Sequence, residues 1–456
     1  MNKPLSITVI TKMTTPNAGN QAISTELIRL LERTHPDASI FAGWRQPGLE
    51  QYSFAKLQRA GSDPLLTMDR WAGHILQSYG SLKDHSRSKI GSPQTLLAFK
   101  VPQNGRKTGS AVELSSKVLP LVSRIRNKGS LALNAPLDYW RGYGRNYGNW
   151  LDVLRRSDWV VYSPAGEVNN EKADYLVRDF LSLRIAQRLG ARVAAVNHSI
   201  EVNDPPLLKL LARSYSGFDA IVVRDPVSAQ LLMDNDVSRE RIKLAPDTAF
   251  LAQPASLQGR ELDETAAGED VKPGTVGISI VPNESFDLAG WGQVIQMLQA
   301  MGKQVLFVSN QMCDVQPVTT SLQKLYGVQV MSRQYDYDEY IRVLSRLELV
   351  ISERYHTCVF SAIANRPFIP LRIRQMRKMP GITSLLNYAI PPVDMTCAGW
   401  QESVMAHVHC IYSHYDRVAA FLREAVSRAA KLAELNARWN GAPGTLQADT
   451  IGMTTK

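Results

Sequence analysis

The stretch that decides the fold is LELVISERYHTCVFSAIANRPFIPL, residues 347–371. Its first part, LELVIS (347–352), is a short apolar run, which predicts a buried strand. Residues 357–365 predict a helix, and PFIPL (367–371) predicts the next strand. A strand, a helix and a further strand in this order form the repeating unit of a parallel sheet that is covered by helices.

The same alternation runs through two other parts of the chain. In the first half, strands are predicted at 5–11, 157–163, 191–199, 218–223 and 242–247. In the second half they are predicted at 275–281, 303–309, 347–352 and 367–371. We therefore predict an α/β fold with two Rossmann-like, doubly wound domains that face a cleft.

The domain boundaries follow from changes in composition. Residues 1–255 form the predicted N-terminal domain, which carries an irregular, partly helical and basic insertion at 50–135. Residues 256–275 lie in a segment rich in Gly, Pro, Ala and acidic residues and form the predicted linker. Residues 276–405 form the C-terminal domain, and 406–456 a C-terminal helix that returns to brace the first domain, followed by a tail.

Composition and charge limit the class of protein. The 456 residues are 44% hydrophobic and 21% charged, as in ordinary globular proteins. The net charge of +10, with a basic stretch at 81–130, suits an anionic partner such as a phosphorylated substrate or the inner face of a membrane. The four cysteines form no CxxC pair, and no signal peptide or apolar run of membrane-spanning length is visible. These features predict a cytoplasmic protein.

Arg354 and His356 are the first candidate site residues. They lie between a predicted strand end and a predicted helix start, where open backbone N–H groups and the partial positive charge of the helix attract anions. Arginine adds a planar fork that matches phosphate or carboxylate, and histidine can move a proton near neutral pH. The alternative is a surface pair of Arg354 with Glu353 and a histidine that simply belongs to the core.

Arg224 ends a predicted strand of the first domain, in the position that Arg354 occupies in the second. Two arginines on opposite walls of a cleft suit a ligand with two anionic groups, although Arg224 could instead pair with Asp225. Asp247 and Glu167 are candidate acids or bases. A basic group follows the strand at 367–371 and could hold an anion or form a solvated loop: Arg372, Arg374, Arg377 and Lys378. His407 and His409 lack a third ligand in the sequence, so no metal site is predicted.

Five segments in order resemble the polysaccharide pyruvyl transferase family. They are NAGNQAI (17–23), VNHSIEVNDP (196–205), IVVRDPVSAQLL (221–232), APDTAFL (245–251) and ISERYHTCVFSAIANRPFIPL (351–371). The resemblance implies a fold like that of GT-B glycosyltransferases. It also implies transfer of pyruvate from phosphoenolpyruvate to a sugar of a polysaccharide or its lipid-linked precursor, with formation of a pyruvate ketal and no cofactor.

The resemblance also assigns roles to residues. Arg224, Arg354 and His356 would contact phosphoenolpyruvate, and Ser279 and Lys378 are further candidates by their position at strand ends of the second domain. His356 is the first choice for proton transfer, with Asp247 and His198 as candidate partners. Arg354, a further catalytic residue, would stabilise the departing phosphate together with Arg224. Four residues are assigned to the acceptor: Asn17, Gly19, Glu167 and His198.

Three rival functions remain open on the sequence. A nucleotide-sugar glycosyltransferase of GT-B type would have the same sheets, because fold does not determine function. A nucleic-acid or anionic-surface binder would explain the charge, but no nucleic-acid-binding motif is present. An inactive relative would need to have lost the Arg and His residues that are present here.

Overall fold

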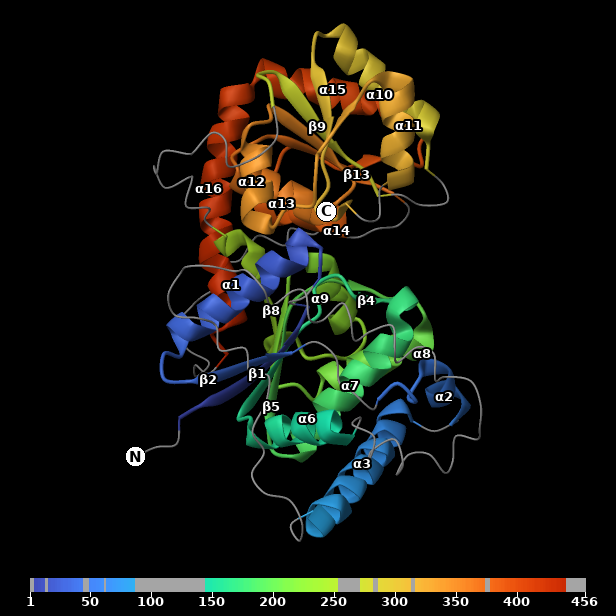
Figure 1. Cartoon of the computed structure of the whole chain (residues 1–456), viewed down its shortest axis with the longest axis vertical. Helices are drawn as coiled ribbons and strands as arrows, with labels where there is room; N and C mark the ends of the chain where they lie inside the picture. Colours follow the sequence, from blue (N-terminus) through green and yellow to red (C-terminus); the bar gives the residue numbers. More distant parts are fainter. Residues whose placement is uncertain are drawn as a thin grey trace.

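The protein is described from a computed structural model, in which two α/β domains lie one above the other along the long axis (Figure 1). The structure describes residues 4–12, 15–43, 49–60, 63–86, 144–252, 271–281, 286–312, 316–373 and 378–439. Within these residues, no helix is long and apolar enough to cross a membrane. The prediction of two doubly wound domains is confirmed.

The first domain is built on a parallel sheet in the order β2-β1-β3-β5-β7-β8. Its strands are β1 (Ser6–Thr11), β2 (Ser39–Gly43), β3 (Trp159–Ser163), β5 (Arg192–His198), β7 (Ala220–Val223) and β8 (Ile242–Leu244). Its helices are α1 (Ala18–Thr34), α2 (Phe54–Arg59), α3 (Pro64–Ser86), α6 (Gly144–Arg156), α7 (Ala173–Arg188), α8 (Pro205–Tyr215) and α9 (Pro226–Met233). Strands β1, β3 and β7 are buried along their whole length, as expected for a parallel sheet covered on both faces.

The second domain has a parallel sheet in the order β11-β10-β9-β12-β13-β14. Its strands are β9 (Thr275–Ser279), β10 (Gln304–Phe307), β11 (Gln329–Val330), β12 (Leu349–Ser352), β13 (Phe368–Arg372) and β14 (Val393–Asp394). Its helices are α10 (Leu288–Ala300), α11 (Gln316–Tyr326), α12 (Tyr337–Ser345), α13 (Tyr355–Ile363), α14 (Lys378–Leu386) and α15 (Trp400–Ser413). The strand order is that of a Rossmann fold, with the reversal between β9 and β12.

Each sheet therefore has a switch point, on either side of which successive strands of the chain are added in opposite directions. In the first domain this point lies between β1 and β3, and in the second between β9 and β12. Ligands of open α/β sheets bind outside the carboxyl ends of the strands at such points. A small two-stranded sheet of β4 (Val168–Asn169) and β6 (Ile200–Glu201) follows the carboxyl ends of β3 and β5.

Helix α13 begins earlier than the sequence predicted. The expected start was residue 357, but the helix begins at Tyr355 and its N-cap is Arg354. The last residue of β12 stabilises this N-cap, because the Ser352 hydroxyl accepts a hydrogen bond from the Arg354 backbone N–H at 2.9 Å. His356 consequently lies in the first turn of the helix rather than in the loop before it.

The C-terminal segment is broken where one continuous helix was predicted over 406–439. Helix α15 ends at Ser413 and packs on α10 of the second domain, whereas α16 (Tyr415–Ala433) starts anew after His414. The second domain therefore extends past residue 405. Helix α16 then leads back to the first domain, as Figure 1 shows, and Trp439 packs against Trp159 in a tilted arrangement with ring centroids 4.4 Å apart.

Two predicted regions lie partly outside the described residues. In the insertion at 50–135, the structure describes α2 and α3 but nothing after residue 86. In the linker at 256–275, it describes only residues 271–275, of which Thr275 already belongs to β9. Arg374 and Arg377 also lie outside the described residues.

Candidate functional site

The two domains contact each other beyond the carboxyl ends of their sheets. The N-terminus of α1 meets the segment after β10, where the Ala18 backbone N–H donates to the Asn310 carbonyl at 2.9 Å. Asn17 caps α1 through its Oδ1 atom, and its Nδ2 donates to Gln311 Oε1 at 2.8 Å. Asn17, which the sequence assigned to the acceptor, is thus a contact between the domains in this structure.

Arg224 is the centre of the site on the first domain. It follows β7, is only 2% exposed, and donates from Nη1 to Asp247 Oδ2 at 2.9 Å and from Nε to Ser199 Oγ at 2.8 Å. The alternative interpretation, a pair of Arg224 with Asp225, is wrong. Asp225 instead caps α9 and accepts hydrogen bonds from the backbone and hydroxyl of Ser228.

The buried Arg224–Asp247 pair holds both groups in their charged forms. Burial alone raises the pKa of Asp247, but its interactions with His356 and Arg224 outweigh burial and lower the pKa overall. Asp247 caps the short helix η5 (Thr248–Leu251) with its other oxygen, which accepts from the Ala249 N–H at 3.2 Å. Two separate contacts therefore fix the carboxylate that holds Arg224.

The second domain supplies Tyr355 and His356 to the same place. The guanidinium carbon of Arg224 lies 4.2 Å from the ring centroid of Tyr355. The His356 Nε2 atom lies 3.5 Å from Asp247 Oδ2, too long for a good hydrogen bond, and it has no hydrogen-bond partner among the described residues. We therefore treat the His356–Asp247 contact as electrostatic.

His356 lies directly against Gly19 of the first domain. A Cβ atom on Gly19 would be 2.2 Å from His356 Nδ1, so no other residue fits at position 19 while the domains are arranged in this way. Burial lowers the pKa of His356, Asp247 acts in the opposite direction, and the charges of Arg224 and Lys378 lower it further. The imidazole is therefore neutral at neutral pH.

Arg354 and Lys378 complete a group of cations around Arg224. Arg354 Nε donates to the Ile280 carbonyl at 3.2 Å, which directs the side chain along the end of β9. Lys378, the first residue of α14, reaches across the domain junction, with Nζ 3.9 Å from Glu201 Oε2. Burial lowers the pKa of Lys378, and the positive charges of Arg224 and Arg354 also lower it. Mutual repulsion of this kind favours the binding of an anion between the cations.

Glu353 is not the surface partner of Arg354 that the alternative interpretation required. It is 2% exposed and accepts hydrogen bonds from Trp291 Nε1 at 3.1 Å and from the Val281 N–H at 2.7 Å. Burial raises its pKa to about 7, although these hydrogen bonds act in the opposite direction. Glu353 therefore fixes the end of β12 immediately before Arg354.

Three further predicted site residues have partners within their own domain. Ser279 is 3.3 Å from the Thr357 hydroxyl, and Glu167 forms an ion pair with Lys12. His198 is fully buried, with Nδ1 3.1 Å from the Val196 carbonyl and Nε2 2.6 Å from the Tyr215 hydroxyl. Burial lowers the pKa of His198 to about 4. All three residues lie near strand ends, as predicted, but these contacts occupy the side chains.

The sequence did not single out Ser199, Glu201 or Tyr355. Tyr355 stands between Arg354 and His356, and its aromatic ring fits the largely apolar segment around it, so nothing in the pattern marked its hydroxyl. Ser199 and Glu201 follow β5 in a segment without periodicity, so only the resemblance of 196–205 pointed toward them. No group of three His, Cys, Asp or Glu side chains suited to a metal occurs in the described part of the chain.

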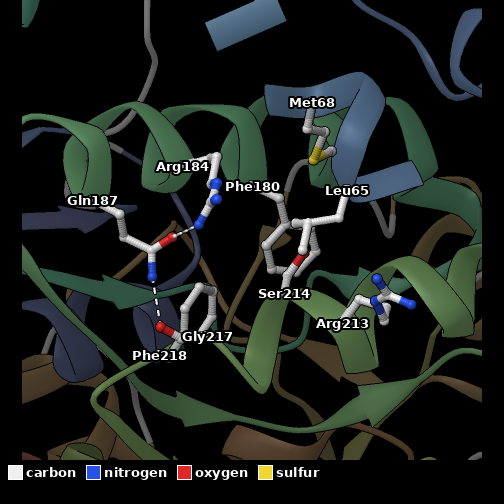
Figure 2. A pocket seen from close by; sticks show the side chains of 9 residues that line it. All are labelled: Leu65, Met68, Phe180, Arg184, Gln187, Arg213, Ser214, Gly217 and Phe218. Carbon is white, nitrogen blue, oxygen red and sulfur yellow. Dashed lines mark hydrogen bonds between the residues drawn. The ribbon is translucent and has the colours of Figure 1, made fainter. Parts of the chain in front are cut away.

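A small pocket lies away from this site, between α3, α7 and α8 (Figure 2). Leu65, Met68, Phe180 and Phe218 form its apolar lining. Two cations line it. Arg184 donates from Nε to Asp69 Oδ1 at 2.5 Å, and Arg213 forms an ion pair with Asp63 at 3.0 Å. The pocket is thus a gap in the packing of α3 on the first domain, with its charge already paired.

Comparison with known proteins identifies related sequences and folds. The model of the polysaccharide pyruvyl transferase family matches residues 17–374, most of the chain. No curated protein sequence matches the chain. A Listeria monocytogenes protein classed as a UDP-N-acetylglucosamine 2-epimerase has a similar structure, with a TM-score of 0.50 at 10% identity over 96% of this chain and 94% of that one.

Two other solved structures are similar to this chain at slightly lower scores. The UDP-GlcNAc 2-epimerase of Methanocaldococcus jannaschii gives a TM-score of 0.49 at 13% identity, over 89% of this chain and 91% of that one. The UDP-GlcNAc 2-epimerase of Neisseria meningitidis gives 0.48 at 11% identity, over 94% and 98%. At these identities the likeness concerns the fold, which is of GT-B type, and not the activity.

Proposed function

Because this chain belongs to the polysaccharide pyruvyl transferase family, we propose that it transfers pyruvate from phosphoenolpyruvate to a sugar. The acceptor is a sugar of a polysaccharide or of its lipid-linked precursor, and the product is a pyruvate ketal. The donor needs no cofactor, since phosphoenolpyruvate itself carries the leaving group.

The observation that carries this proposal is the group of cations at the domain junction. Arg224 comes from the first domain, and Arg354 and Lys378 come from the second. Phosphoenolpyruvate is small and bears a phosphate and a carboxylate, so cations from two sides can each hold one end. Asp247 and Glu201 offset part of this charge, as expected for a site that must also release phosphate.

The chemistry requires three proton transfers, one to the methylene carbon of phosphoenolpyruvate and one from each of two sugar hydroxyls. The methylene carbon of phosphoenolpyruvate gains a proton, which gives C2 cationic character. A sugar hydroxyl then attacks C2 and loses a proton, which balances the proton that the methylene carbon gained. The C–O bond to phosphate then breaks, and a second hydroxyl closes the ketal and gives its proton to the departing phosphate. A neutral His356 can accept the hydroxyl proton, and Arg224 and Arg354 stabilise the phosphate as it leaves.

Contact between the domains supports a role for closure. Two glycines lie directly against the opposite domain. A Cβ atom on Gly19 would lie 2.2 Å from His356, and a Cβ atom on Gly381 would lie 2.7 Å from Asp225. Such contacts exclude water from a reacting carbon, which matters because a cationic C2 would otherwise react with water. We place the acceptor on the first domain, beside Gly19 and Glu167, as the sequence predicted.

The test is incubation of the purified protein with phosphoenolpyruvate and candidate glycans, followed by mass spectrometry. We expect a glycan mass gain of one pyruvate less one water, together with release of phosphate. Arg354→Met should abolish the gain, whereas Arg428→Met, on the exposed face of α16, should not change it. Tight binding of a UDP-sugar without binding of phosphoenolpyruvate would reject the proposal in favour of a nucleotide-sugar glycosyltransferase.

A further inference from the structure

Buried polar atoms without partners are concentrated around the site. In the described part of the chain, eight buried side-chain nitrogen or oxygen atoms have no hydrogen-bond partner. Three of them lie around Arg224 and Lys378: Tyr355 Oη, His356 Nε2 and Glu201 Oε1. An unsatisfied buried polar group is costly, so a cluster of them indicates atoms that await a ligand.

Tyr355 is the most deeply buried of the three residues. It is the first residue of α13 and is 5% exposed, and the guanidinium of Arg224 lies over its ring. The ring belongs to the second domain and the guanidinium to the first. The ring therefore supports the orientation of an arginine that is already held by Asp247 and Ser199.

The hydroxyl of Tyr355 needs a separate explanation, because a phenylalanine ring would support Arg224 equally well. Burial raises the pKa of Tyr355, and the nearby Asp247 raises it further, so the hydroxyl keeps its proton and is available as a donor. Arg224 Nη2 faces Gly166: a Cβ atom placed on that glycine would lie 3.7 Å from Nη2. The hydrogen bonds of Arg224 to the described residues use Nη1 and Nε, and Nη2 makes none. Tyr355 Oη and Arg224 Nη2, on two side chains in contact, are thus both donors without an acceptor among the described residues.

We propose that Tyr355 binds the donor substrate, with its hydroxyl donating a hydrogen bond to an oxygen of the anion that Arg224 holds. The ring and the hydroxyl then have distinct tasks: the ring supports Arg224, and the hydroxyl binds the ligand. This inference rests on the proposed function, which supplies an anion of the right size and charge. It adds a hydrogen-bond donor to a site that the sequence described only through Arg, Lys and His.

The test is Tyr355→Phe, which removes one oxygen and keeps the ring. Binding of phosphoenolpyruvate, measured by titration calorimetry without any acceptor, should weaken about ten- to a hundredfold, as expected for a lost hydrogen bond to a charged group. The melting temperature should stay the same or rise, because an unsatisfied buried hydroxyl is removed. Tyr355→Leu should weaken binding further, since the support of Arg224 is lost as well.

The matched control is Tyr388→Phe in the same domain. Tyr388 is 7% exposed, but its hydroxyl accepts a hydrogen bond from the Phe368 N–H at 3.1 Å. This variant should lose stability and keep its affinity for phosphoenolpyruvate. Titration with inorganic phosphate distinguishes the two ends of the ligand, because weaker phosphate binding in Tyr355→Phe places the hydroxyl on the phosphate and unchanged binding places it on the carboxylate.

The results separate this inference from the proposed function. If the wild-type protein binds phosphoenolpyruvate and Tyr355→Phe binds it equally well, the hydroxyl has no role in binding and the inference is wrong, while the proposed function stands. If the wild-type protein neither binds phosphoenolpyruvate nor transfers pyruvate, the proposed function is wrong and the inference is wrong with it.

Discussion

The imidazole of His356 rests on the Cα atom of Gly19, although the two residues belong to different domains and lie more than 300 positions apart. Both residues are in the first turn of a helix, α1 and α13 respectively. Two helix N-termini therefore meet at the point where the candidate site lies. The domains can therefore come together in this way only if residue 19 is a glycine.

Gly19→Ala should impair transfer far more than it impairs folding. The added Cβ would lie 2.2 Å from His356 Nδ1, so the domains must separate or the ring must turn away from Asp247. We expect at least a tenfold loss in kcat for pyruvyl transfer, with a melting temperature within a few degrees of the wild type. Steady-state assays and thermal unfolding of the same samples measure both effects.

Gly73→Ala in α3 is the matched control. A Cβ there would lie 3.8 Å from its nearest neighbour, an ordinary contact, and alanine favours the helix by about 0.5–1 kcal/mol. This variant should keep its activity and unfold at the same or a higher temperature. Full activity of Gly19→Ala would show that His356 and Gly19 need not be in contact during turnover.

Asp247→Asn should strongly destabilise the protein. Arg224 and Asp247 have side chains that are 1% and 0% exposed, so removing one charge leaves the other buried without compensation, at a cost of about 3–5 kcal/mol. Since the pKa of Asp247 is lowered from 3.8, its contribution is present above that pH and is lost as the pH falls through the folded-state pKa. Chemical unfolding measures this: the difference in free energy of unfolding between wild type and variant should be smaller near pH 3 than at pH 7.

Glu424→Gln provides the contrast, because it disrupts an exposed pair with Arg428 one turn along α16. Exposed pairs of this kind contribute little, so no measurable change in the free energy of unfolding is expected. If Asp247→Asn were as stable as Glu424→Gln, the buried pair would have no structural role.

The imidazole of His356 should titrate below pH 6.5 in the free protein, because burial and the neighbouring cations lower its pKa. Binding of phosphate should move the pKa upward, since an anion offsets the charges of Arg224 and Lys378. NMR titration of labelled histidine, with the signal assigned by its absence in His356→Gln, measures both values. Titration at or above pH 6.5 without ligand would contradict the neutral imidazole inferred from the structure.

Glu353 should make stability depend on pH in the opposite way to Asp247. Its pKa is raised from 4.5 to about 7, so its protonated form stabilises the fold below about pH 4.5, and this contribution is lost as the pH rises to about 7. Glu353→Gln should remove that dependence and lower stability throughout, because its amide would place a donor against the Val281 or Trp291 N–H. Equal slopes of unfolding free energy against pH in both proteins would reject this account.

Sequence reasoning located Arg224, Arg354 and His356 because each follows a predicted strand, and parallel strands present their carboxyl ends on one side of the sheet. It could not pair Arg224 with Asp247 or place His356 on Gly19, because these contacts depend on loop conformation and on the relative orientation of the domains. Tyr355 was missed because an aromatic ring in an apolar segment indicates a core residue, and the sequence does not show that the hydroxyl lacks a partner. The break at His414 was missed because the residues on both sides of it favour a helix.

The chain passes between the domains twice, from η5 to β9 and again through α16 to Trp439, which packs against Trp159. Helix α16 packs against η5, so the second connection passes beside the point at which the first one leaves the N-terminal domain. Two connections that leave the first domain at one place should act as a hinge. They should permit rotation of one domain about that place and resist translation of one domain along the other. Each opening and closing should therefore return His356 to Gly19, and Arg224 to Tyr355, in the same register.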